Sequence, residues 1–218
     1  MPKGSLKADT LDVLETAGLD VSELRDPGRH LIVRGRDTRV GEGAVGDIEF
    51  VIVRPSDAPA FVGCGGADCG ICGEDSLLEA ATGTVELVDL KFGACRFIVA
   101  EPADRAGRAE RAYAWRGAMR VATKYPRITE SYYARKGEQV EVVKLHGNIE
   151  LGPIVGMTDR IVDITATGTT LRENNLVIVD DVMECTARFF AGPAAYRCDA
   201  RIRDLADRLA AATAKKGE

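Results

Sequence analysis

With 218 residues, of which 45% are hydrophobic and 29% are charged, the chain has the composition of a globular protein, which excludes a mainly disordered one. Its net charge of −5 argues against a binder of duplex nucleic acid, and no apolar run is long enough for a membrane span or a secretory signal. We therefore expect a cytoplasmic protein that does not associate with membranes and whose six cysteines are free thiols.

Short apolar segments rich in valine and isoleucine alternate with segments that have helical spacing or helix end signals. In chain order, we expect a helix at 5–17, strands at 31–33 and 48–53, helices at 56–62 and 76–81, strands at 85–90 and 97–100, a helix at 128–136, strands at 140–145, 161–164 and 177–182, and a helix at 199–212. The charged segment 101–111 is either a helix or a loop. The apolar runs are continuous, which is typical of strands buried on both faces, and the alternation predicts an α/β fold with a largely parallel sheet.

Residues 161–171 contain a candidate phosphate site. An apolar strand leads to Asp163, and Thr167-Gly168-Thr169-Thr170 follows as a short loop before a helix start. Backbone N–H groups and threonine hydroxyls at such a turn hold phosphate well, and the glycine lets the backbone approach closely. Asp163 would bind ribose hydroxyls or a magnesium ion. The same residues also suit a plain capped connection between a strand and a helix, so spacing alone leaves both interpretations open.

Two further acids, Asp180 and Asp181, follow the apolar run 177–179. Paired acids after a strand resemble the first half of the signature of type I phosphoribosyltransferases. That signature continues into a threonine- and glycine-rich loop, whereas Met183-Glu184-Cys185 follows here. We therefore predict that these two acids only mark the end of a strand.

Cys64, Cys69 and Cys72 have the C-x4-C-x2-C spacing that opens a plant-type ferredoxin site. Such a cluster needs a fourth ligand, and free cysteine is a good small core residue, so we favour free thiols. An iron–sulfur protein stays as an alternative, and it predicts a brown preparation that contains stoichiometric iron.

Ordered motifs extend over nearly the whole chain. They lie at residues 2–6 (PKGSL), 53–59 (VRPSDAP), 66–73 (GADCGICG), 87–93 (LVDLKFG), 120–126 (RVATKYP), 142–153 (VVKLHGNIELGP) and 156–172 (GMTDRIVDITATGTTLR). In this order they closely resemble ATP phosphoribosyltransferase, the first enzyme of histidine biosynthesis. The resemblance implies that ATP and 5-phosphoribosyl-1-pyrophosphate (PRPP) are joined, with magnesium, to give N1-(5-phosphoribosyl)-ATP and pyrophosphate. The alternative is a catalytically weak or inactive homologue that binds nucleotide or PRPP.

The family resemblance also implies the fold of type II periplasmic binding proteins, in which two α/β lobes enclose the active site in the cleft between them. Lobe I would comprise residues 1–93 and 178–218, and lobe II residues 94–177. In lobe II, the 5-phosphate would bind at Thr167, Gly168, Thr169 and Thr170, and the ribose at Glu150 and Asp163. Asp163 would also contact the magnesium ion indirectly.

In lobe I, the resemblance points to three catalytic cations, which are Lys3, Arg29 and Arg54. Arginine suits phosphate because its planar fork bonds two oxygens at once. Arg29 and Arg54 would bind ATP together with Asp68. His146 falls at a position that the family varies, so we expect a solvent-facing or rim residue there.

Chain length resembles the short form of the family, so we expect no C-terminal regulatory domain. Short forms assemble with a regulatory subunit that resembles histidyl-tRNA synthetase, which implies a homodimer within a hetero-oligomer. Two departures support the inactive alternative. Ser5 stands where many members carry arginine, and no apolar strand precedes Pro2.

Overall fold

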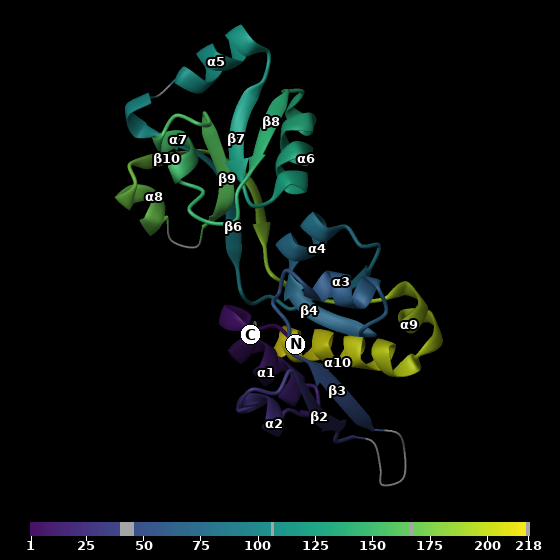
Figure 1. The fold of residues 1–218 in the computed structure, drawn as a ribbon. Coiled ribbons are helices and arrows are strands. Elements are labelled where there is room, and N and C mark those ends of the chain that lie inside the picture. The colour runs from purple at the N-terminus through teal and green to yellow at the C-terminus, as the bar shows by residue number, and fades with distance from the viewer. Residues whose placement is uncertain (40–45, 106, 166–167, 217–218) are drawn as a thin grey trace. The chain divides into compact units, whose positions relative to one another are not determined.

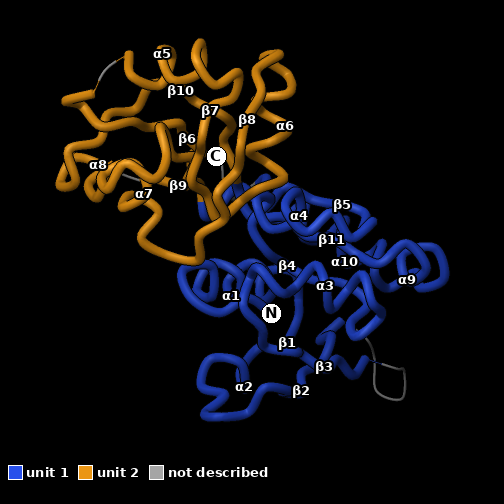
Figure 2. The backbone as a smooth tube through the Cα atoms, turned by 45° about the horizontal axis from the view of Figure 1, so that its top comes forward, with its two compact units in different colours: residues 1–93, 186–218 blue, residues 94–185 orange. Residues whose placement is uncertain are grey.

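The structure is a computed structural model that describes residues 1–39, 46–105, 107–165 and 168–216 (Figure 1). The chain divides into two compact α/β units, of which unit 1 is Met1–Gly93 with Thr186–Glu218 and unit 2 is Ala94–Cys185 (Figure 2). The chain re-enters unit 1 at Thr186, later than the predicted residue 178. The difference arises because the last strand of unit 2 extends to Cys185.

Unit 1 contains two antiparallel three-stranded sheets. The first has the order β1-β2-β3, with β1 at Leu19–Asp20, β2 at Ile32–Asp37 and β3 at Asp47–Val51. The second has the order β4-β11-β5, with β4 at Cys69–Gly73, β11 at Ala187–Ala191 and β5 at Val85–Asp89. The helices are the short η1 (Gly4–Leu6), α1 (Lys7–Thr16), α2 (Ser22–Arg25), α3 (Ala58–Gly63), α4 (Glu74–Ala80), α9 (Pro193–Cys198) and α10 (Ala200–Lys216).

The long helix α10 is held in unit 1 by an apolar face and by one buried cation. Ile202 and Leu209 are buried in the same core cluster as residues of α1, as the predicted helical spacing requires. The guanidinium of Arg208 donates to the carbonyl of Ala17 at 2.7 Å and pairs with Asp37 at 2.6 Å. One side chain therefore connects the end of α1, the end of β2 and α10.

The first residues of the chain join a strand segment of unit 1. The Lys3 N–H donates to the carbonyl of Val53 at 3.0 Å, and the Val53 N–H donates to the carbonyl of Met1 at 3.1 Å. Pro2 and Val53 thus form an isolated parallel bridge. This short parallel pairing fixes the backbone of Lys3 in unit 1.

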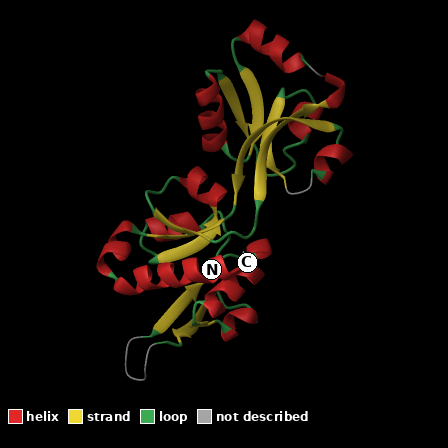
Figure 3. Cartoon of the chain, turned by 180° about the vertical axis from the view of Figure 1, so that it is seen from behind, coloured by secondary structure: helices red, strands yellow, loops and turns green. Residues whose placement is uncertain are grey.

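Unit 2 is built on one five-stranded sheet in the order β10-β6-β9-β7-β8. The strands are β6 (Cys95–Pro102), β7 (Met119–Thr123), β8 (Val140–Lys144), β9 (Arg160–Thr165) and β10 (Leu176–Cys185). The helices are η2 (Ala103–Arg105), α5 (Arg108–Arg116), α6 (Pro126–Lys136), α7 (Leu151–Ile154) and α8 (Thr169–Glu173). Helices flank this sheet (Figure 3). Side chains of α6 pack on the face that carries Phe97 and Val121, whereas Leu171 of α8 packs on the face that carries Ile98 and Ala122.

The predicted largely parallel sheet is wrong. Among the described strands, β7 pairs in parallel with β8 and with β9, and every other strand pairing is antiparallel. Continuous apolar runs indicate that a strand is covered on both faces, as β6 and β7 are, but they carry no information on its direction. An antiparallel strand covered by helices on both faces has the same pattern.

The interpretation of Asp180 and Asp181 as a strand end is also wrong, because both lie in the middle of β10. This strand is at the edge of the sheet, and Val177, Ile178 and Val179 are exposed rather than buried. Register shifts flank the two acids, and Asp180 accepts hydrogen bonds from Tyr132 and, at 2.6 Å, from Lys136. Asp180 therefore fastens α6 to an edge strand, whereas Asp181 pairs with Arg96 of β6 at 3.3 Å. No helix in the described part of the chain combines the length and apolar character needed to cross a membrane.

Candidate functional site

A cavity of about 610 Å³ opens in unit 2 at the carboxyl ends of its three parallel strands. Its lining is formed by Lys124, Tyr125, His146, Gly147, Asn148, Ile149, Glu150, Leu151, Asp163, Thr170 and Asn174. Lys124 follows β7 directly, His146 comes two residues after β8, and Asp163 is near the end of β9. Parallel strands present their carboxyl ends at one edge, and this edge is where α/β folds bind ligands.

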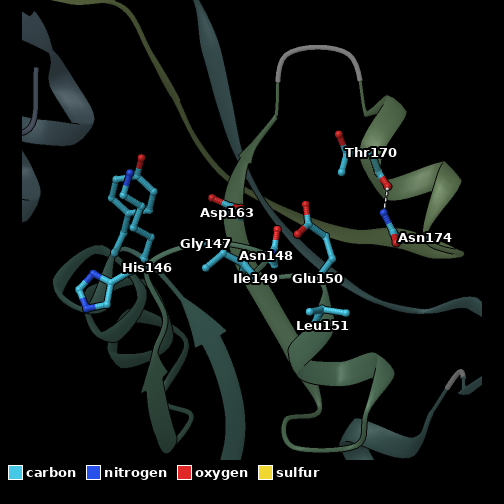
Figure 4. A pocket seen from close by; sticks show the side chains of 11 residues that line it. His146, Gly147, Asn148, Ile149, Glu150, Leu151, Asp163, Thr170 and Asn174 are labelled. Atoms are coloured by element: carbon cyan, nitrogen blue, oxygen red, sulfur yellow. Dashed lines mark hydrogen bonds between the residues drawn. The ribbon is translucent and has the colours of Figure 1, made fainter. Parts of the chain in front are cut away.

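Two carboxylates occupy the middle of this cavity (Figure 4). Figure 4 shows Asp163 and Glu150 between His146 on one side and Thr170 with Asn174 on the other. Asp163 accepts a hydrogen bond from the Ile164 N–H at 2.8 Å. Burial raises the pKa of Asp163 to about 6, and the negative charge of Glu150 acts in the same direction. A partly desolvated carboxylate of this kind is a strong acceptor for the hydroxyl groups of a sugar.

Of the predicted phosphate loop, Thr170 lines the same cavity, Gly168 and Thr169 do not, and Thr167 is outside the described residues. Gly168 has a φ of +70° and precedes α8, and a Cβ atom built there meets nothing within 4 Å. Thr170 lines the cavity, and its carbonyl accepts a hydrogen bond from the Asn174 side chain at 2.9 Å. The hydroxyl of Thr169 accepts from Arg172 at 3.2 Å. The Gly168 N–H donates to the Thr165 hydroxyl at 2.8 Å, and the open space beside Gly168, next to the exposed residues Thr169 and Thr170, is suited to an anion.

The donor set for a metal ion is small. Nowhere in the described residues do three or more histidine, cysteine, aspartate or glutamate side chains gather as a metal site. The cavity supplies the two carboxylates of Glu150 and Asp163. This fits magnesium, which is commonly held by one or two carboxylates together with substrate phosphates.

A second cavity, of about 390 Å³, lies in unit 1. Its lining includes Lys3 and Arg29, which are distant in sequence, and the apolar residues Leu24, Leu31 and Ile52. The pairing with Val53 fixes Lys3, and a turn closed by the His30 N–H on the carbonyl of Pro27 carries Arg29. The cavity thus combines cations with apolar surface.

Two residues predicted for the same lobe are not part of that cavity. Arg54 and Asp68 do not line it. The backbone carbonyl of Asp68 accepts a hydrogen bond from the Gly192 N–H at 3.0 Å. The structure of unit 1 therefore brings Lys3 and Arg29 together, and the roles of Arg54 and Asp68 stay predictions.

The three closely spaced cysteines do not face a common point. Cys72 is buried beside Val62 and Phe190, whereas Cys69 packs against the other core cluster of unit 1, so the two lie on opposite faces of β4. Cys64 is exposed just after α3. Burial raises the pKa of the Cys69 thiol to about 11 and also raises that of Cys72. Because Cys69 and Cys72 point to opposite faces of the strand, they are not placed to ligate one cluster.

Sequence reasoning assigned no role to Lys124 or Asn174, and it placed His146 at a rim without a function. His146 is exposed and lines the cavity, as expected for a rim residue. The available signal was position, because Lys124 and His146 both stand just beyond the end of a strand. Only the parallel pairing of β7 and β8 shows that these two ends meet.

The model of the ATP phosphoribosyltransferase family matches residues 54–211. The chain is similar to the ATP phosphoribosyltransferase of Rubrobacter xylanophilus, with 47% identity over 94% of this chain and 91% of the relative. It is also similar to that of Moorella thermoacetica, with 44% identity over 100% of this chain and 93% of the relative. These are near full-length matches to proteins of one name.

Comparison with solved structures agrees with these sequence matches. The ATP phosphoribosyl transferase (HisG:HisZ) complex from Thermotoga maritima matches with a TM-score of 0.74 and 31% identity, over 98% of this chain and 96% of that one. The amino-acid-binding protein ArtJ from Geobacillus stearothermophilus matches with a TM-score of 0.56 and 11% identity, over 100% of this chain and 84% of that one. The second likeness shows the fold alone, and it confirms the predicted two-unit fold of type II periplasmic binding proteins. The chain belongs to the ATP phosphoribosyltransferase family.

Proposed function

We propose that the protein transfers the phosphoribosyl group of PRPP to N1 of ATP and releases pyrophosphate, the first step of histidine biosynthesis. Membership of the family supports the reaction. The observation in this chain that carries the proposal is the cavity of unit 2 at the carboxyl ends of parallel strands, whose lining combines Thr170 of the predicted phosphate loop with the carboxylates of Glu150 and Asp163. PRPP has the matching parts, a phosphate and a ribose diol.

In this proposal, unit 2 binds PRPP. The backbone N–H groups and hydroxyls of Thr169 and Thr170 hold the 5-phosphate in the open space beside Gly168, and Thr167 completes the loop. The carboxylates of Glu150 and Asp163 accept hydrogen bonds from the ribose hydroxyls. These contacts orient C1 of the ribose, which matters because adenine N1 is a weak nucleophile that must attack in line with the departing oxygen.

Unit 1 supplies cations for the nucleotide and the leaving group. Lys3 and Arg29 line its cavity, whose apolar residues suit an adenine ring. Arg54 and Asp68 are proposed to bind ATP from the same unit. The cations stabilise the negative charge that develops on pyrophosphate as its bond to C1 breaks.

Magnesium is proposed as the cofactor. Glu150 and Asp163 would hold it, with Asp163 acting indirectly, and the phosphates of PRPP would supply the remaining oxygens. When bound, the ion neutralises charge on the pyrophosphate and so makes it a better leaving group. The residues of the chain have the separate task of holding the ribose in register with ATP.

Assembly follows the structural relative in this proposal. The Thermotoga maritima structure is that of a HisG:HisZ complex, which supports a hetero-oligomer here. We propose that a homodimer of this chain binds a regulatory subunit resembling histidyl-tRNA synthetase, and that the complex acts in the cytoplasm.

The direct test uses the purified chain with ATP, PRPP and magnesium, followed by mass spectrometry of the nucleotide products. The reaction is run with the chain alone and with a candidate regulatory subunit. A peak at the mass of phosphoribosyl-ATP is expected. If folded protein gives no such peak in either mixture, the proposed function is wrong.

Gly168→Val is expected to weaken PRPP binding by about tenfold or more, because the side chain fills the space proposed for the 5-phosphate and removes charge-assisted hydrogen bonds. Isothermal titration calorimetry measures the effect. The left-handed backbone at Gly168 adds about 1–2 kcal/mol of strain for any other residue.

Gly137→Val is the matched control for that strain. Gly137 has a φ of +72° and open space around its Cβ position, and it ends α6 away from the cavity lining. The Gly137→Val variant should lose about as much stability as Gly168→Val and should keep its affinity for PRPP. Equal affinity of the two variants would contradict the assignment of the phosphate loop.

A further inference from the structure

The cavity of unit 2 contains a cation that the roles assigned above do not use. Its described lining combines two carboxylates with one lysine, Lys124, and one histidine, His146. The ammonium of Lys124 forms no hydrogen bond or ion pair with the described residues, and it lies 5.9 Å from the ring centroid of Tyr125. An exposed ammonium beside a cavity, with no protein anion bound to it, is available to a ligand.

Strand order places the polar groups of the cavity in a row. The parallel register pairs Thr123 of β7 with Val162 of β9 on one side and with Lys144 of β8 on the other. The Leu145 N–H continues this pairing with a hydrogen bond to the Thr123 carbonyl at 2.9 Å. The chain segments that follow therefore lie side by side in the order Asp163, Lys124, His146.

Thr170 of the proposed phosphate loop lies on the side of the carboxylates that is opposite His146 (Figure 4). In Figure 4, Thr170 and Asn174 are on one side of the two carboxylates, and His146 is on the other. The parallel register of β7 with β9 puts Lys124 next to Asp163, so its positive charge acts on that carboxylate. The cavity thus has an anion site, then two carboxylates, then a second group of donors.

PRPP has the same order of parts, with a 5-phosphate, a ribose diol and a pyrophosphate on C1. If the 5-phosphate is at residues 168–170 and the diol is at the carboxylates, the pyrophosphate lies over the ends of β7 and β8. We infer that Lys124, with His146 beside it, binds the pyrophosphate of PRPP. This inference rests on the proposed function and adds a leaving-group contact within unit 2.

The chemistry suits a lysine. As the bond between C1 and the pyrophosphate oxygen breaks, its electron pair stays on the pyrophosphate, while the new bond forms between C1 and N1 of adenine. A compact ammonium with three donors can follow that growing charge over several oxygens. The imidazole of His146 donates one further hydrogen bond. Lys124 also keeps the two carboxylates from repelling the incoming pyrophosphate.

Lys124→Met tests the inference by calorimetric titration with PRPP, ribose 5-phosphate and ATP. Ribose 5-phosphate has the 5-phosphate and the diol but no pyrophosphate. The variant is expected to bind PRPP about tenfold or more weakly and to bind ribose 5-phosphate as the unmodified protein does. Lys124 is exposed, so the melting temperature of the variant should equal that of the unmodified protein.

Lys144→Met is the matched control, because it removes the same charge from an exposed residue at the end of β8 that does not line the cavity. It should bind all three ligands normally. Unchanged PRPP affinity of Lys124→Met, or an equal loss for PRPP and ribose 5-phosphate, overturns the inference. A loss confined to ATP also overturns it and assigns Lys124 to the triphosphate.

The experiments distinguish a wrong proposed function from a wrong role of Lys124. If the unmodified protein does not bind PRPP, the proposed function is overturned together with this inference. If it binds PRPP and forms product while Lys124→Met behaves like Lys144→Met, only the role of Lys124 is overturned.

Discussion

Asp163→Asn is expected to slow phosphoribosyl transfer strongly and, at the same time, to make the protein more stable at neutral pH. The carboxylate accepts hydrogen bonds from the ribose in the proposed function, and their loss should reduce kcat/KM by about 30- to 100-fold. Stability should rise because burial disfavours the charge, as the pKa of about 6 indicates. Asparagine has a similar shape and can still accept the hydrogen bond from the Ile164 N–H.

The pH dependence of that gain has a definite sign. The Asp163 carboxyl holds its proton up to about pH 6 in the folded state and releases it near pH 3.8 when unfolded. Between these values the folded state binds more protons, so its stability falls as the pH rises. The side chain of the asparagine variant does not ionise, so the stability of this variant does not fall over that pH range. Its advantage in free energy of unfolding should therefore be greatest above pH 6, at about 2–3 kcal/mol, and should vanish toward pH 4.

Urea unfolding at pH 4.5 and pH 8, with steady-state kinetics at pH 8, measures both effects. Asp104→Asn is the control, because Asp104 is an exposed residue of the same unit outside the cavity lining, and it should change neither quantity. A variant of Asp163 that is less stable at pH 8 and turns over normally would show that the carboxylate is structural.

Prediction from sequence succeeded where the apolar signal was strong and failed where it was ambiguous. The core of β9 and the helix α6 were expected close to their observed places, because Val162 and Ile128 belong to clear patterns. β7 was missed because Arg120 interrupts its apolar run and its last residue, Thr123, is polar although fully buried. β10 was placed correctly but assigned the wrong environment. Edge position depends on which strand pairs with which, and a single run of valine and isoleucine does not encode that.

The candidate site shows the same division. Asp163 and Thr170 stand in one continuous motif, so the chain alone brought them to attention, and the cavity contains both. Glu150 came only from the family resemblance. Lys124 and His146 are separated from the motif by whole elements, and their closeness depends on the parallel register of β7 with β8 and β9. Residues within one loop can be read from sequence, whereas residues joined by strand pairing require the fold.

Arg188→Met is expected to destabilise the protein by about 3–5 kcal/mol without touching the proposed ligand contacts. Arg188 lies in β11, the central strand of its sheet, and its side chain is 13% exposed. The guanidinium is 2.8 Å from the carboxylate of Glu74 and 3.0 Å from that of Glu86, and it also pairs with Asp89. Removal of the cation leaves three acids close together in a partly buried position, where they repel one another.

Asp89 shows how strongly this cluster depends on its cations. Burial acts to raise the pKa of Asp89, but hydrogen bonds from Lys91, Thr186 and Arg188 outweigh it and hold that pKa below the usual range. A lowered pKa in the folded state contributes stability above about pH 4, which is lost as the pH falls further. The deficit of Arg188→Met should therefore shrink in acid, where protonation of the acids relieves their repulsion.

Arg201→Met separates this effect from the loss of an arginine in general. Arg201 pairs with Asp199, but its side chain is 61% exposed, and an exposed pair contributes about 1 kcal/mol or less. Urea unfolding of both variants at pH 7.5 and pH 4 gives the comparison. Equal stability of the two variants at pH 7.5 would mean that solvent screens the cluster around Arg188 as fully as it screens a surface pair. The central strand β11 would then be held by its apolar residues, above all Phe189 and Phe190, which are almost completely buried on its two faces.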